Sequence, residues 1–159
     1  MIEKLTSAGA LATALTLPGL DPRDPQRAAR TLDDQAEAIA GVLGQLGGDV
    51  VLVGHSGANG PVSVVLDRHP ELIRRVIWVD SGPMANDGAF APDLPAAVLE
   101  LPLPDFDTLS QQASLEGLND QHLTRFRSKA VPEPAGVARA SVELTNAARH
   151  DVATTLICC

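Results

Sequence analysis

Two spacings of apolar residues alternate along the chain, and each predicts a different kind of element. Apolar residues recur every three or four positions over 32–46, which predicts a helix with one buried stripe. The short, continuously apolar runs at 50–53 and 76–79 are typical of strands covered on both faces, as in parallel sheets. A helix at 61–69 separates these runs, and a last strand is expected at 154–159. This order predicts an α/β fold with a mostly parallel sheet flanked by helices.

The first thirty residues carry weaker signals. A helix tail closed by Gly9 precedes residues 11–17, where apolar residues alternate with small or hydroxyl residues and predict a strand. A loop rich in proline and charge is expected at 20–30. Thr31 and Asp34 then have the spacing of a capping box, in which two side chains satisfy free N–H groups at a helix start.

The middle of the chain is richer in proline than the rest. Seven of the twelve prolines fall within 81–134, a span too long for a plain connection between a strand and a helix. We expect a single domain, 1–159, with an inserted lid at 83–134 that covers the carboxyl ends of the strands. Short helices are expected at 108–115 and 120–130. Within 94–130 we expect an excursion outside the sheet without strands, because proline cannot donate to a ladder.

Composition narrows the classes of function. Apolar residues make up 45% and charged residues 20% of the chain, which is typical of a folded domain. A net charge of −8 and the absence of tyrosine argue against a nucleic-acid partner. No apolar stretch is long enough to cross a membrane, and Glu3 and scattered polar residues weaken the resemblance of 1–20 to a signal peptide. The adjacent Cys158 and Cys159 offer no disulfide framework, so we expect a cytoplasmic protein.

The most informative motif is the pentad Gly54-His55-Ser56-Gly57-Ala58, which falls between an expected strand and an expected helix. A tight turn with small flanking residues there would hold the Ser56 hydroxyl in the open as a nucleophile. The Gly57 N–H, at the start of the helix, would then face a developing oxyanion. The alternative is a glycine-rich turn whose serine only caps the helix.

The residues VLVGHSGA at 51–58 resemble the nucleophile elbow of the α/β-hydrolase superfamily, particularly of small serine esterases. The resemblance extends to LPGLD at 17–21, HPE at 69–71 and VDSG at 79–82. Ala58 departs from the commonest pattern, which has glycine at this position. The resemblance implies a serine hydrolase with Ser56 as nucleophile and Gly57 in the oxyanion hole, acting without a cofactor or a metal on a small apolar ester.

The resemblance also implies an acid and a histidine base, and here the sequence fits poorly. None of the four histidines, His55, His69, His122 and His150, stands where the family has its base, on a loop after the final strand. Asp80 ends the strand after the elbow, a position that a minority of the family uses for the acid. The commoner position lies beyond the last expected strand, within which the sequence ends.

The sequence therefore resembles the middle of a hydrolase. In the sheet of the family, the strand that precedes the oxyanion loop lies between the strands expected here at 11–17 and 50–53. This sequence has no counterpart of that strand. We expect weak or no activity from this chain by itself. The alternatives are a binding module that retains the fold without catalysis, or a non-functional gene fragment. Glu133, Glu143 and Asp151 lack partner His or Cys at ligand spacing, so no metal site is expected, and the sequence does not indicate an oligomeric state.

Overall fold

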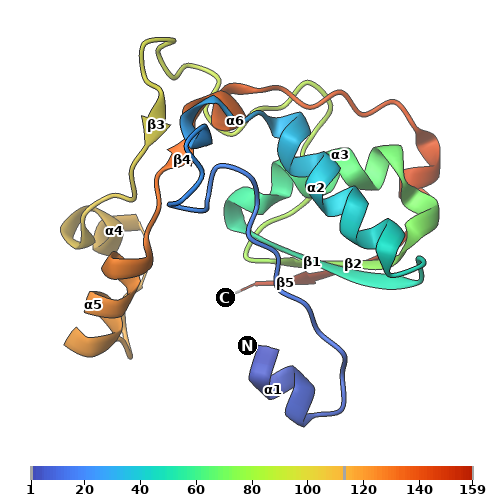
Figure 1. Ribbon diagram of the computed structural model, residues 1–159, viewed down its shortest axis with the longest axis horizontal. Helices are drawn as coiled ribbons and strands as arrows, with labels where there is room; N and C mark the ends of the chain where they lie inside the picture. Colours follow the sequence, from blue (N-terminus) through green and yellow to red (C-terminus); the bar gives the residue numbers. More distant parts are fainter. Residues whose placement is uncertain (1, 113, 159) are drawn as a thin grey trace.

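The computed structural model describes residues 2–112 and 114–158, and a three-stranded parallel sheet lies at its centre (Figure 1). The strands are β1 (Val50–His55), β2 (Ile73–Val79) and β5 (Ala153–Ile157), and β2 lies between the other two. Leu52 is opposite Val76, and Val76 is opposite Thr154. The predicted α/β fold with a parallel sheet is confirmed.

Helices α2 (Leu32–Gln45) and α3 (Asn59–Arg68) cover one face of this sheet (Figure 1). The capping box before α2 forms as predicted, because the Asp34 N–H donates to Thr31 Oγ1 at 3.1 Å and the Thr31 N–H donates to Asp34 Oδ2 at 2.8 Å. The predicted stripe of α2 is buried over four of its five positions, Leu32, Ala36, Ile39 and Leu43. Leu46 lies beyond the end of the helix and is exposed.

The opposite face of the sheet is open over much of its area. Val53 of β1 is 48% exposed, and Ile157 of β5, on the same face, is 44% exposed. Helix α1 (Ile2–Ser7) buries none of its residues. The sequence indicated strands covered on both faces, and this is wrong for the face turned away from α2 and α3. An apolar run shows that a strand is hydrophobic. Whether both faces of that strand are buried depends on where the helices pack.

The strand predicted at 11–17 does not form. These residues have no strand partner among the described residues, and Leu11 is fully exposed. An alternating pattern makes a strand only where a neighbouring strand takes up its backbone N–H and C=O groups. The described sheet ends at β1, and no strand from 11–17 extends it.

The described residues between β2 and β5 contribute no strand to the central sheet. Strands β3 (Glu100–Leu101) and β4 (Glu133–Pro134) form a separate antiparallel pair. The expectation of no strands within 94–130 is therefore wrong at β3, whereas β4 lies beyond that range. Pro134 has no N–H to give to the pair, and the next N–H, of Ala135, donates to the Leu99 carbonyl oxygen. The lid assignment of residues 83–134 stays a prediction.

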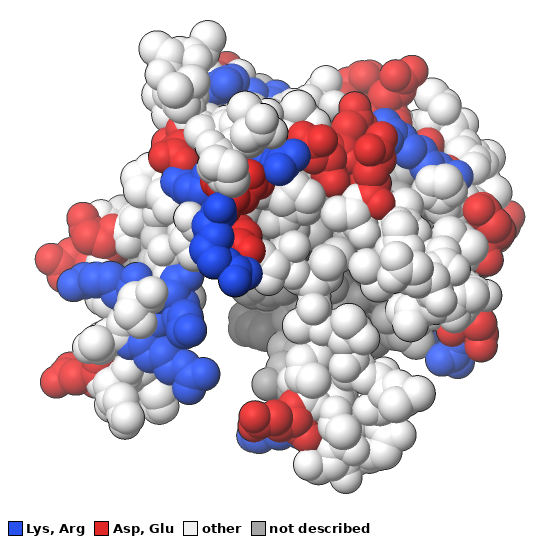
Figure 2. Space-filling view, in the orientation of Figure 1, with Lys and Arg blue, Asp and Glu red and all other residues white. Residues whose placement is uncertain are grey.

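Two helices project from this segment, α4 (Phe106–Gln112) and α5 (Asp120–Lys129), close to the predicted ranges. The rings of Phe106 and Phe126 stack with centroids 6.2 Å apart, and the Arg127 guanidinium lies 4.6 Å from the centre of the Phe106 ring. Figure 2 shows basic side chains gathered over these helices, although the chain as a whole is acidic.

Short helical segments connect the remaining parts. They are η1 (Arg27–Ala29), η2 (Ser56–Ala58), η3 (Pro70–Leu72), α6 (Ala135–Arg139) and η4 (Ala147–Asp151). The buried Asp67 of α3 accepts from the Asn146 N–H at 2.9 Å and from Arg149 at 3.1 Å, which ties η4 to α3. Among the described residues, no helix is long and apolar enough to cross a membrane.

Candidate active site

Ser56 stands at the junction of β1 and α3, as the sequence predicted. Strand β1 ends at His55, η2 begins at Ser56, and α3 begins at Asn59. The backbone φ of Ser56 is +48°, in the left-handed region that non-glycine residues rarely adopt. This conformation turns the chain sharply from the strand into the helix and leaves the Ser56 side chain exposed.

Packing explains one of the two glycines that flank the turn. A Cβ on Gly54 would lie 3.3 Å from Val62 Cγ2, which is tighter than ordinary packing, and 3.5 Å from a ring carbon of Trp78, so glycine suits the close approach of α3 to β1. A Cβ on Gly57 would meet nothing within 4 Å. The expectation that a small residue is needed beside the turn is therefore supported at Gly54, whereas packing makes no such demand at Gly57.

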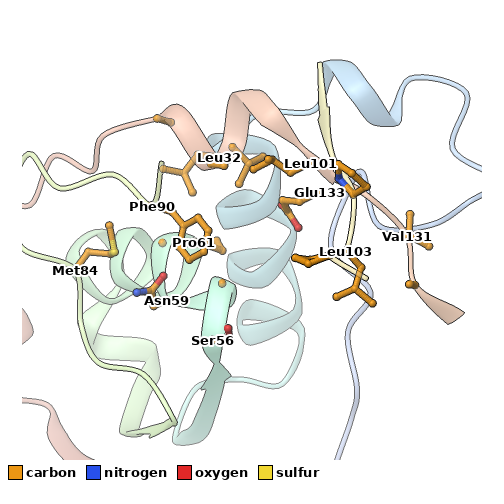
Figure 3. Close-up of a pocket in the computed structure, with 18 of the residues that line it drawn as sticks. Leu32, Ser56, Asn59, Pro61, Met84, Phe90, Leu101, Leu103, Val131 and Glu133 are labelled. Carbon is orange, nitrogen blue, oxygen red and sulfur yellow. The ribbon is translucent and has the colours of Figure 1, made fainter. Parts of the chain in front are cut away.

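Ser56 lines a cavity of about 350 Å³ (Figure 3). Its walls are mainly apolar, and they come from α2, from α3 and from the segment after β2. Examples are Leu32, Pro61, Met84, Phe90, Leu101, Leu103 and Phe126. The polar side chains are those of Ser56, Asn59 and Glu133. A cavity of this size and lining suits a small, mainly apolar molecule.

Gly57 also lines the cavity, at the start of the helical segment that follows Ser56. The first N–H groups of a helix have no partner within it, so they can bind a negatively charged oxygen. The Asn59 N–H is occupied, because it donates to the carbonyl oxygen of Ser56. The Gly57 N–H belongs to the residue directly after Ser56, and it is the donor that the sequence assigned to the oxyanion hole.

The four histidines all lie in the described residues, and none of them lines the cavity. His55 is exposed at the end of β1, and His69 follows the last residue of α3, with Nδ1 3.6 Å from a Glu71 carboxylate oxygen. His122 takes part in the cap of α5, where its backbone N–H donates to Asn119 at 2.9 Å. His150 lies in η4.

Asp80, the candidate acid, directly follows β2 and is exposed. Its backbone N–H donates to the Ile157 carbonyl oxygen at 2.7 Å, and it does not line the cavity. Among residues 2–112 and 114–158, no group of three or more His, Cys, Asp or Glu side chains is gathered closely enough to hold a metal ion.

Glu133 is the cavity residue whose place the sequence did not reveal. It lies in β4, at the far end of the predicted lid from β2, and burial raises the pKa of its carboxyl above the usual value. Gln35 of α2 donates from Nε2 to Glu133 Oε1 at 2.9 Å. No periodic pattern or motif in the sequence links two residues so far apart in the chain.

Comparison with known proteins identifies a protein family that matches almost the whole sequence. A sequence profile described as "Alpha/beta hydrolase family" matches residues 2–159. A search of curated proteins found no match.

Several solved structures share the fold. An extracellular alpha/beta-hydrolase from a Paenibacillus species matches with a TM-score of 0.78 and 17% identity, over 98% of this chain and 68% of that one. A methylesterase from Arabidopsis matches with a TM-score of 0.74 and 18% identity, over 97% and 68%. A pyrethroid hydrolase from Sphingobium faniae JZ-2 matches with a TM-score of 0.66 and 16% identity, over 95% and 67%. This coverage agrees with the expectation that the sequence corresponds to part of the family fold.

Proposed function

The chain belongs to the alpha/beta hydrolase family, and from that premise we propose that Ser56 is the nucleophile of a site that cleaves carboxylic esters. The observation that carries the proposal is the left-handed backbone of Ser56 at the end of β1, with its side chain on an apolar cavity. A strained conformation at a cavity is the arrangement that a nucleophile elbow needs. The Arabidopsis relative, a methylesterase by name, supports an ester as the substrate class.

In this reaction the Ser56 Oγ attacks the carbonyl carbon of the ester while its proton passes to a base. The Gly57 N–H donates to the oxyanion that forms on the carbonyl oxygen. When the intermediate collapses, the ester C–O bond breaks and the alcohol leaves with the proton. Water then hydrolyses the acyl–serine ester, which releases the carboxylic acid and restores the Ser56 hydroxyl.

We propose that this chain by itself performs the reaction weakly or not at all. No histidine lines the cavity, so the Ser56 proton has no histidine acceptor there. In a well-studied serine protease, loss of the base alone lowers turnover about a millionfold. Ester hydrolysis by the purified chain should therefore exceed that of a Ser56→Ala variant only slightly.

External imidazole provides the test, because it can replace a missing histidine base. The chain is incubated with a fluorophosphonate probe, with and without imidazole, and the modified residue is identified by mass spectrometry. We expect slow labelling of Ser56 that imidazole accelerates severalfold. Ser81→Ala, which removes another serine just beyond β2, should leave the labelling unchanged. Labelling that imidazole does not accelerate, or that persists in Ser56→Ala, argues against a nucleophilic Ser56.

The second candidate function is a binding module that uses the same cavity without catalysis. The absence of histidine from the cavity walls favours it. This alternative predicts saturable binding of small apolar esters, no imidazole effect, and equal behaviour of the wild-type chain and Ser56→Ala. Binding can be followed by NMR titration while the same samples are checked for hydrolysis.

We also propose a small apolar ester as the partner and the cytoplasm as the location. The adjacent cysteines support a reducing compartment, and Cys158 is a free thiol. One of the similar proteins is described as extracellular. Fractionation of cells that express the tagged chain tests the location: recovery in the culture medium or periplasm would contradict it.

A further inference from the structure

Among the described residues that line the cavity, Glu133 has the only carboxylate, and most of the other side chains are apolar. Strand β4 holds it opposite Leu101, and the residue is half-buried. No Lys or Arg of the described residues forms an ion pair with it. Arg27 of η1 contacts the same small sheet, but it binds the Glu100 carboxylate and the Pro132 carbonyl oxygen. A carboxylate in such surroundings needs hydrogen-bond donors in place of the water that it has lost.

One donor is built into the fold. Gln35 is only 1% exposed, and its Nε2 donates to two acceptors, the Pro18 carbonyl oxygen at 3.1 Å and Glu133 Oε1 at 2.9 Å. Both hydrogens of the amide are thereby used, which fixes the amide in place. Because Gln35 holds Oε1, the orientation of the Glu133 carboxyl is set from α2.

The second oxygen of Glu133, Oε2, has no hydrogen-bond partner within the described residues and is not sealed from solvent. Figure 3 shows the Glu133 carboxyl group directed into the space between Pro61 and Leu103. In the same view Ser56 lies on another side of the cavity, at the end of β1. A molecule that fills the cavity can therefore present one end to Ser56 and another to Glu133.

We propose that Glu133 determines specificity, its Oε2 accepting a hydrogen bond from a hydroxyl group on the part of the substrate remote from the ester. The inference rests on the proposed function for the place of the ester at Ser56. It refines the substrate class from a small apolar ester to one that carries a hydrogen-bond donor. A hydroxyl that enters the cavity loses its water, and Glu133 is the acceptor that replaces it. A ligand that offers only an acceptor in that position gains nothing from a carboxylate.

Three ligands that differ in one group test this inference. They are the methyl esters of 3-phenylpropanoic acid, 3-(4-hydroxyphenyl)propanoic acid and 3-(4-methoxyphenyl)propanoic acid. Each is titrated into the Ser56→Ala chain and its binding is followed by NMR chemical shifts. Because this variant cannot form an acyl enzyme, the result does not depend on catalysis and stands apart from the imidazole test. We expect the hydroxylated ligand to bind about tenfold more tightly than the other two, as one hydrogen bond to a charged group implies.

Variants then assign the preference to Glu133. In Ser56→Ala/Glu133→Leu the preference for the hydroxylated ligand should fall to about onefold, while the unsubstituted ester binds at least as tightly as before. Ser56→Ala/Glu100→Gln, changed at the neighbouring carboxylate that does not line the cavity, should keep the preference. Should the leucine variant not fold, Glu133→Gln decides, since it keeps an acceptor for Gln35 but removes the charge and should lower the preference severalfold.

Four results would overturn the inference. The first is an unchanged preference in a folded Glu133 variant. The second is equal or tighter binding of the methoxy ligand, which would make Glu133 a donor. The third is failure of all three ligands to bind saturably to the Ser56→Ala chain. An equal loss of affinity for all ligands in Glu133→Gln would also count against it, because that outcome indicates a structural role alone.

Discussion

Ser56 and Asp80 leave two neighbouring parallel strands at the same level and in the same backbone conformation. The strand residues that precede them, His55 and Val79, are opposite each other in the sheet. The φ angles of Ser56 and Asp80 are +48° and +47°. Both residues therefore turn the chain sharply at the carboxyl edge of the sheet, where ligands bind in open α/β folds. For Ser56 this conformation carries a steric cost, whereas aspartate, as at Asp80, adopts it more readily.

The strain at Ser56 should be measurable. Glycine adopts the left-handed conformation without steric cost, so Ser56→Gly should stabilise the chain by about 0.5–1 kcal/mol, net of glycine's larger loss of entropy on folding. Ser56→Ala keeps the strain and should change the free energy of unfolding by less than about 0.5 kcal/mol. Urea unfolding of the three proteins measures the difference. Equal stabilities for the glycine and alanine variants would mean that the turn is unstrained.

The two glycines of the elbow should respond differently to alanine. Gly54→Ala places a methyl group against Val62 and Trp78 and should cost about 1–3 kcal/mol through overpacking. Gly57→Ala enters open space and should cost less than about 0.5 kcal/mol. Thermal unfolding of both variants provides the comparison. A larger cost at Gly57 than at Gly54 would contradict the packing described around the turn.

The capping box of α2 makes a separate contribution to stability. Thr31→Ala removes the acceptor for the Asp34 N–H and should lower the free energy of unfolding by about 1 kcal/mol at neutral pH. Thr16→Ala, in an exposed segment outside helices and strands, is the matched control and should have little effect. Denaturant titration distinguishes them. If Thr16→Ala lowered the free energy of unfolding as much as Thr31→Ala, the loss at Thr31 could not be attributed to the cap.

The raised pKa of Glu133 predicts the direction in which the stability of the chain changes with pH. Burial favours the protonated carboxyl in the folded chain, so its stabilising contribution is present below the unfolded pKa and is lost as the pH rises through the folded pKa. Glu133→Gln does not titrate and keeps an oxygen for Gln35. The Tm of this variant relative to wild type should therefore increase between pH 4 and pH 7.

The control for this pH series is Glu37→Gln, at an exposed carboxylate of α2. Its Tm relative to wild type should stay nearly constant over the same range. The chain as a whole still loses stability in acid, because several carboxylates have a lowered pKa, among them Asp21 at about 2 beside Arg23. A decrease in the Glu133→Gln difference as the pH rises would show that the Glu133 carboxylate is stabilised, not penalised, by its surroundings.

Local signals in the sequence were sufficient for the strands and helices around the elbow. The apolar runs at 50–53 and 76–79, the helical stripe after Thr31 and the pentad around Ser56 each predicted an element or a turn that the structure contains. These features depend on residues within a few positions of one another. A capping box, a buried strand and a tight turn are therefore determined by nearby residues.

Tertiary structure decided the features that need a distant partner. Residues 11–17 have the pattern of a strand but form none, because a strand exists only when a neighbour completes its hydrogen bonds. The open sheet face depends on both helices packing on the other side. Glu133 lines the cavity at the place where Gln35 of α2 meets β4 in space. A periodic pattern of residues does not encode a contact between segments so far apart in the chain. Such a contact arises only when the elements pack together.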